Sequence, residues 1–183
     1  MSTLPNAAPI SKADREKLLA LLHESRQRFF ASFAGVSDEQ SRRHPAEGSW
    51  SVLDCVEHIA AAETRMLGML QGPRRPRPSG APNREEIFLQ RMADRSRKAV
   101  SPEGARPTDR FPNLAAAGKQ FESARAVTIR FVEENTEDLR ATEVTHPHAM
   151  VGDVSAYEMV IIMAKHAERH ALQIEEIKRR FGN

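Results

Sequence analysis

Three histidines are the residues of this chain best suited to chemistry. Two of them, His166 and His170, lie four residues apart in the strongly helical segment SAYEMVIIMAKHAERHALQIEEIKRR, residues 155–180. Side chains at this spacing lie one above the other on a helix face, so two imidazoles can bind one transition-metal ion. The alternative is that one or both histidines border the core and bond to carboxylates or backbone groups.

The third histidine, His58, lies on a different predicted helix, three residues after Cys55 and four before Ala62. This places it at the edge of an apolar stripe. If its helix packs beside the segment at 155–180, the three imidazoles can converge. A three-histidine site leaves coordination positions open for water or substrate, as in catalytic metal sites. For His58 alone, a hydrogen-bonded histidine at the core edge is the simpler interpretation.

Other candidates lie close to these histidines in the sequence. Cys55 could complete a closed, structural metal site, but a single helical cysteine is more often a small core residue. His146 and His148 could rim the site from a loop, or could simply be solvated. Glu57 and Glu168 are adjacent to the candidate ligands in sequence but not on the same helix face, so no general base is assigned.

Four helical segments must position these residues. Ser11, Ser51 and Ser155 each precede an apolar helical pattern and have an acidic residue three positions later, which is typical of a helix start. The predicted helices span about 11–34, 51–71, 114–135 and 155–181. No convincing strand pattern and no internal repeat is present. The sequence therefore predicts an all-α fold, a four-helix bundle with one long crossover connection between its second and third helices.

That connection, residues 71–113, holds seven of the eleven prolines. A short helix is predicted inside it, from Asn83 to about Val100. Such a long connection is either a functional lid or only the crossover that joins two distant helices. Its basic cluster lacks interleaved aromatic residues, which favours a solvated loop over a nucleic-acid surface. The cluster consists of Arg74, Arg75 and Arg77.

One buried ion pair is also predicted, between Arg125 on the inner side of the third helix and Glu63 on the second. A buried pair of this kind is costly unless both groups are well hydrogen bonded. We therefore expect either a structural pair or one that positions an anionic substrate, and we favour the structural role.

The bulk properties predict a single soluble domain. The chain has 183 residues, a formal charge of +2 and one cysteine. We expect a flexible N-terminal tail at 1–10 and one domain at 11–183. The near-neutral charge gives no preference for polyanions, and no apolar run is long enough for a signal peptide or a membrane helix. We expect a cytoplasmic protein with no nucleic-acid partner and no membrane partner.

Two blocks of the sequence resemble the DinB-like (YfiT-like) superfamily. GSWSVLDCVEHIAAAE resembles its second-helix signature, in which a Trp-Ser start precedes a histidine followed by Leu or Ile. HPHAMVGDVSAYEMVIIMAKHAERHALQIEEIKRR resembles its last-helix signature, in which two histidines four apart precede a Gln-Ile pair. The long proline- and arginine-rich connection departs from the family pattern.

The resemblance implies a four-helix bundle in which His58, His166 and His170 hold a divalent transition metal, with zinc and nickel as the preferred candidates. It implies an enzyme that activates a low-molecular-weight thiol for S-transfer, or a water for hydrolysis, on a small-molecule substrate. Relatives often form homodimers. The alternatives are a non-catalytic metal-binding protein with a stress-related or interaction role, and a protein whose histidines are satisfied in the core without metal.

Overall fold

The computed structural model describes residues 9–96, 101 and 105–182. Residues 1–8 of the predicted tail, and residues 97–100 at the end of the predicted short helix, lie outside the described residues. The division into a tail and one domain stays a prediction.

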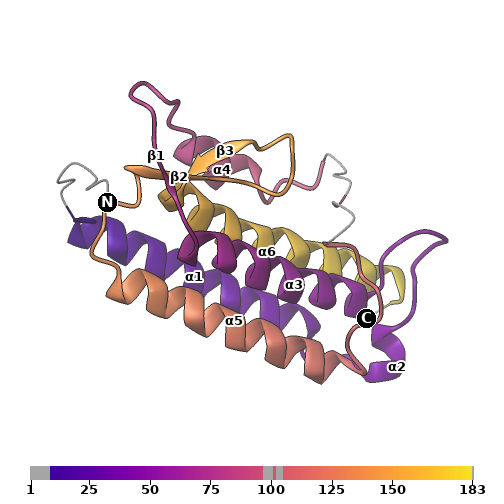
Figure 1. The fold of residues 1–183 in the computed structure, drawn as a ribbon. Helices are drawn as coiled ribbons and strands as arrows, with labels where there is room; N and C mark the ends of the chain where they lie inside the picture. The colour runs from indigo at the N-terminus through magenta and orange to yellow at the C-terminus, as the bar shows by residue number, and fades with distance from the viewer. Residues whose placement is uncertain (1–8, 97–100, 102–104, 183) are drawn as a thin grey trace.

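Four long helices form the body of the molecule, as predicted (Figure 1). Each starts where a polar side chain accepts a hydrogen bond from the backbone amide three residues later. At Ser51 and Ser155, the acidic residue at that third position also binds the cap amide and completes a capping box. The helices are α1 (Lys12–Phe33), α3 (Val52–Gln71), α5 (Leu114–Glu134) and α6 (Ala156–Arg180). None of the described helices is long and apolar enough to span a bilayer.

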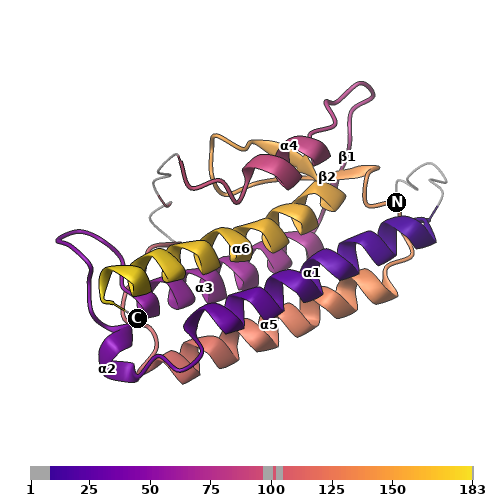
Figure 2. The same ribbon diagram turned by 180° about the vertical axis from the view of Figure 1, so that it is seen from behind.

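The directions of the helices decide which residues can meet. α1 and α6 run in the same direction, and α3 and α5 run in the opposite one (Figures 1 and 2). α3 packs against both α5 and α6. Because α3 and α6 are antiparallel, the first turns of α3 lie beside the middle of α6, where the two spaced histidines are. The long crossover between α3 and α5 makes this arrangement possible.

The four-helix bundle also has a small sheet that the sequence patterns did not indicate. A small antiparallel sheet with the order β1-β2-β3 lies beside the start of α6 (Figure 1). Each strand has only two to four residues, too few to show the alternation of a half-buried strand. The strands are β1 (Arg75–Pro76), β2 (Thr142–Thr145) and β3 (Asp153–Ser155), and the short helices are α2 (Asp38–Ser41) and α4 (Glu85–Arg91).

The sequence suggested that the basic cluster in the crossover lies in a freely solvated loop. The structure shows instead that its arginines form ion pairs. Arg74 forms an ion pair with Glu137, and Arg77 forms one with Glu158, whose Oε2 lies 2.8 Å from Nη1. The side chains of both arginines are largely buried. Arg75 is more exposed but also reaches carboxylates on β2 and β3. The partners lie sixty or more residues away, so the local sequence gave no sign of them.

The predicted ion pair of Arg125 and Glu63 is confirmed at the centre of the bundle. Both side chains are fully buried, with Nε–Oε1 and Nη2–Oε2 distances of 2.7 and 3.0 Å. Arg125 also donates to α1 and α6, and a hydroxyl of α5 donates to Glu63, so the pair contacts all four long helices. These further partners are the Leu22 and Met163 carbonyl oxygens, the Ser25 hydroxyl and the Thr128 hydroxyl.

We expect Arg125→Met alone to lower the free energy of unfolding by about 3–5 kcal/mol, because it leaves the Glu63 carboxylate buried and unpaired. The double variant Arg125→Met/Glu63→Leu should lose less than the single variant, since no charge is then left uncompensated. Urea unfolding of the two variants checks this. A double variant less stable than Arg125→Met would contradict a purely structural role for the pair.

Candidate metal centre

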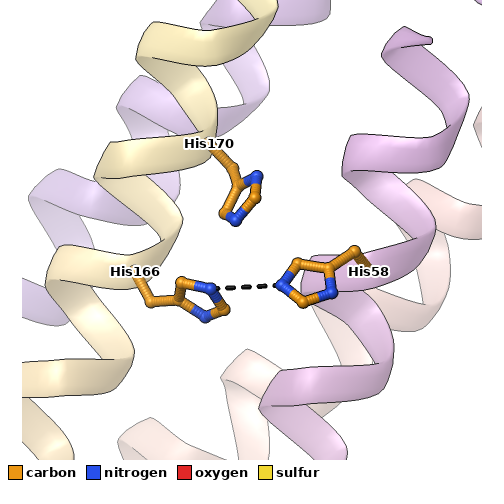
Figure 3. Close-up of side chains that lie close together, drawn as sticks. All are labelled: His58, His166 and His170. Atoms are coloured by element: carbon orange, nitrogen blue, oxygen red, sulfur yellow. Dashed lines mark hydrogen bonds between the residues drawn. The ribbon is translucent and has the colours of Figure 1, made fainter. Parts of the chain in front are cut away.

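Three imidazoles converge between α3 and α6. His58 comes from the second turn of α3, and His166 and His170 come from α6, with all three rings turned toward one another (Figure 3). One nitrogen from each ring belongs to a set whose members all lie within 4.8 Å of one another. The Nε2 atoms of His58 and His166 are 3.2 Å apart. The predicted convergence of the three side chains is confirmed.

Burial keeps these histidines neutral. His58 and His170 are 4% and 6% exposed, and His166 is partly exposed. Loss of hydration lowers the pKa of all three rings, and for His166 and His170 the neighbouring histidines lower it further. A neutral imidazole has one nitrogen lone pair free to bind a metal ion. The cluster is therefore in the protonation state that ligation requires.

The backbone fixes the orientation of His58. Its Nδ1 lies 2.6 Å from the carbonyl oxygen of Ala105, which can only accept a hydrogen bond. Nδ1 must therefore carry the proton, which leaves the Nε2 lone pair directed at the other two histidines. Metal-binding histidines usually have such a second partner behind the ring. Ala105 lies 47 residues further along the chain, so sequence spacing could not indicate it.

The donor set fits a divalent transition metal. Two nitrogens bound to one tetrahedral zinc at ~2.0–2.1 Å lie ~3.3 Å apart, close to the observed His58–His166 spacing. The interpretation without metal requires every buried ring nitrogen to have a partner. Among the described residues, the buried Nδ1 of His170 has none. The three histidines are therefore not all satisfied by protein hydrogen bonds in the described part of the chain.

Cys55 and the two loop histidines do not belong to this set, which among the described residues consists of the three histidines alone. Cys55 is fully buried in the apolar core, and burial raises the pKa of its thiol far above neutrality. The ring of His146 accepts a hydrogen bond from the backbone amide of His148, and burial lowers its pKa to about 4. These residues complete neither a closed metal site nor a ring of ligands around it.

The two glutamates next to the ligands in sequence have other partners. Glu168 forms ion pairs with Arg28 and with Lys165. Glu57 is buried and accepts hydrogen bonds from the backbone amides of Thr108 and Arg110 in the crossover. Neither carboxylate is part of the histidine set, in agreement with their predicted positions on other helix faces.

Trp50 is a site residue that the sequence did not assign to the site. It directly precedes the cap residue Ser51, a position from which an apolar side chain can fold back on the first turn of a helix as a hydrophobic staple. Its ring instead lies against His58 and His170, with ring-centroid distances of 4.9 and 5.8 Å. Trp50 also lines a surface cavity of about 650 Å³, together with Arg106 and Pro107 from the crossover. In the sequence, only the position of Trp50 directly before the cap residue Ser51 indicated that its ring could reach the second turn of α3.

The bundle and its buried cluster define the class: a four-helix protein with a three-histidine centre between antiparallel helices. Residues 21–174 match the model of the DinB superfamily, and the chain belongs to this family. No curated protein matches the chain.

Two solved structures share the fold. YfiT from Bacillus subtilis, described as a probable metal-dependent hydrolase with an unusual four-helix bundle topology, has a TM-score of 0.61 and 16% identity, over 100% of this chain and 94% of its own. A conserved protein from Enterococcus faecalis has a TM-score of 0.63 and 14% identity, over 92% of this chain and 97% of its own. At these identities, the likeness concerns the fold alone.

The lowered histidine pKa values predict the pH dependence of stability in the metal-free protein. Below about pH 6.5 the histidines bind protons in the unfolded chain but not in the folded cluster. The free energy of unfolding should therefore decrease as the pH is lowered. We expect a slope of about 1–3 kcal/mol per pH unit from these groups. Urea unfolding between about pH 7 and pH 5 measures it.

The control for this measurement is a variant with His58, His166 and His170 all changed to Leu. It keeps His146 and every carboxylate, so any remaining slope belongs to those groups. An equal slope in the wild type and the triple variant would contradict neutral burial of the cluster.

Proposed function

We propose that this protein is a metal-dependent enzyme whose single divalent ion is held by His58, His166 and His170. The observation that carries the proposal is the convergence of three imidazoles, two of them buried and one partly exposed, with no cysteine or carboxylate in the set among the described residues. Structural zinc sites usually have four protein ligands, whereas three ligands leave a position for water or substrate. The donor set therefore supports an open, catalytic centre over a closed structural one.

A bound divalent ion would act there as a Lewis acid, lowering the pKa of a water or thiol and so supplying a nucleophile near neutral pH. The residues of the chain contribute the rest. His58 is fixed by the Ala105 carbonyl, and Trp50 covers the rings of His58 and His170 on one side. Trp50 thereby restricts solvent access to the reacting groups.

The cavity beside Trp50 is the candidate entrance for substrate. Its volume of about 650 Å³ falls within the ~300–1,000 Å³ typical of small-molecule sites. Arg106, Asp54 and His44 contribute charged and polar groups to its lining. Trp50 borders both the cavity and the histidine cluster, and none of the three histidines lines the cavity, so a small molecule bound here would reach the metal ligands past the Trp50 ring.

Two nucleophiles are consistent with such a centre. The printed description of YfiT favours water and hydrolysis, and the family resemblance adds low-molecular-weight thiols and S-transfer. The alternative remains a non-catalytic metal-binding protein with a stress-related or interaction role. The homodimer and the thiol substrate are predictions of the resemblance.

We expect the wild-type protein to bind one equivalent of Zn²⁺ or Ni²⁺. Trp50 is the sole tryptophan and contacts two of the proposed ligands, so its fluorescence should report binding. His58→Ala, His166→Ala and His170→Ala should each weaken binding by about 100-fold or more, since a three-ligand site loses a bond directly to the metal.

His23→Ala is the matched control, because His23 is exposed on α1 and belongs to no cluster. It should leave metal affinity unchanged. Full metal occupancy in His58→Ala would refute the three-histidine assignment.

Cobalt substitution should separate the candidate nucleophiles. If a thiol is the substrate, adding low-molecular-weight thiols to the Co²⁺ protein should produce a sulfur-to-cobalt charge-transfer band in the near ultraviolet. Cys55→Ala should leave both the cobalt spectrum and this response unchanged, because Cys55 is not among the ligands. A Co²⁺ spectrum that responds to no thiol and to no change of pH would favour the non-catalytic alternative.

A further inference from the structure

Two consecutive residues of α3 hold the same stretch of the crossover. The ring Nδ1 of His58 donates to the carbonyl oxygen of Ala105 at 2.6 Å. The neighbouring carboxylate, Glu57, accepts the amides of Thr108 and Arg110 at 2.7 and 3.0 Å. Residues 105–110, which we call the strap, are therefore fixed to α3 at both ends, beside the metal centre.

Both oxygens of the Glu57 carboxylate have partners. The residue is 1% exposed, and a carboxylate buried this deeply must be compensated by hydrogen bonds or charge. Each oxygen accepts one strap amide, and the Arg110 guanidinium lies 3.8 Å away. Between the two donors, Asp109 has a left-handed backbone with a φ of 57°, the type of bend that turns neighbouring amides toward one anion.

We propose that Glu57 is a positioning residue for the metal ligand His58. By binding the amides of Thr108 and Arg110, it holds the strap so that the Ala105 carbonyl stays against the His58 ring. That carbonyl fixes the proton on Nδ1 and points Nε2 at His166 and His170. The proposal rests on the metal centre proposed above and adds a residue that does not itself touch the metal.

The geometry does not support Glu57 as a general base. Successive residues of a helix point about 100° apart, so the carboxylate is directed away from the face that carries His58. Both of its oxygens already accept backbone amides, and it is not part of the histidine set. Its effect on the site must therefore pass through the strap.

Glu57→Gln tests this role. The amide group keeps the size of the side chain, but its NH₂ would face a backbone N–H in place of an acceptor, so one strap contact is lost. Zn²⁺ affinity, measured by competition with a chelating indicator, should fall about 10-fold or more, as for other groups that support a metal ligand from behind.

Glu158→Gln is the matched control. Glu158 is also 1% exposed and accepts two backbone amides, those of Arg84 and Ser155, at 2.7 and 2.8 Å. It caps the start of α6, two turns before His166, and is not part of the histidine set. Glu158→Gln should lose stability but keep its zinc affinity.

A second readout needs no metal. In ¹⁵N-detected spectra of the metal-free wild type, His58 should be a single tautomer with its proton on Nδ1, exchanging slowly with solvent. In Glu57→Gln this signal should shift toward a mixture of tautomers, and in Glu158→Gln it should not. If Glu57→Gln folds too poorly to study, Thr108→Pro removes one strap donor from the opposite side and should have the same effect.

The outcomes separate the two proposals. Wild-type protein that binds no metal would overturn the proposed function, while the His58 tautomer would still test the role of Glu57. Normal zinc binding in the wild type, with unchanged affinity and tautomer in a folded Glu57→Gln, would overturn the role of Glu57 alone. Equal losses of affinity in Glu57→Gln and Glu158→Gln would also overturn it, because a general loss of stability would then explain both.

Discussion

Three imidazoles meet between α3 and α6, two of them buried and one partly exposed. Loss of hydration lowers the pKa of all three rings, and for His166 and His170 the neighbouring histidines lower it further. Such a cluster is stable only if the rings find donors, acceptors or a shared cation. The antiparallel course of α3 and α6 brings the rings together, and the long crossover between α3 and α5 permits that course. Much of the architecture can be understood as support for this one contact region.

The crossover is therefore more than a connection. It supplies the Ala105 carbonyl behind His58, and Arg106 and Pro107 line the cavity beside Trp50. Its first part is held by ion pairs of Arg74 with Glu137, which follows α5, and of Arg77 with Glu158, in the first turn of α6. At the centre of the bundle, Arg125 and Glu63 join the four long helices. The crossover, which shows little periodicity in its sequence, thus contacts both the histidine cluster and the start of α6.

The features that sequence could predict are those encoded locally. Ser51 and Ser155 mark helix starts through residues three positions away, and the spacing of His166 and His170 follows from one helix turn. The short strands were missed because two to four residues cannot show a period. The roles of Ala105 and of Trp50 were missed because each depends on contacts with distant parts of the chain. His58 was a candidate from its place at the edge of a helical stripe, and the family resemblance then implied that it is a ligand.

If the centre is catalytic, the cavity beside Trp50 and the strap that borders it would select the substrate. The histidine set would determine which metal ion is bound. The most direct test of the account is X-ray absorption at the zinc edge of the zinc-loaded protein. We predict three imidazole nitrogens at about 2.0–2.1 Å, with the remaining coordination completed by oxygen at a similar distance. A sulfur neighbour at about 2.3 Å, or fewer than three imidazoles, would contradict the three-histidine centre.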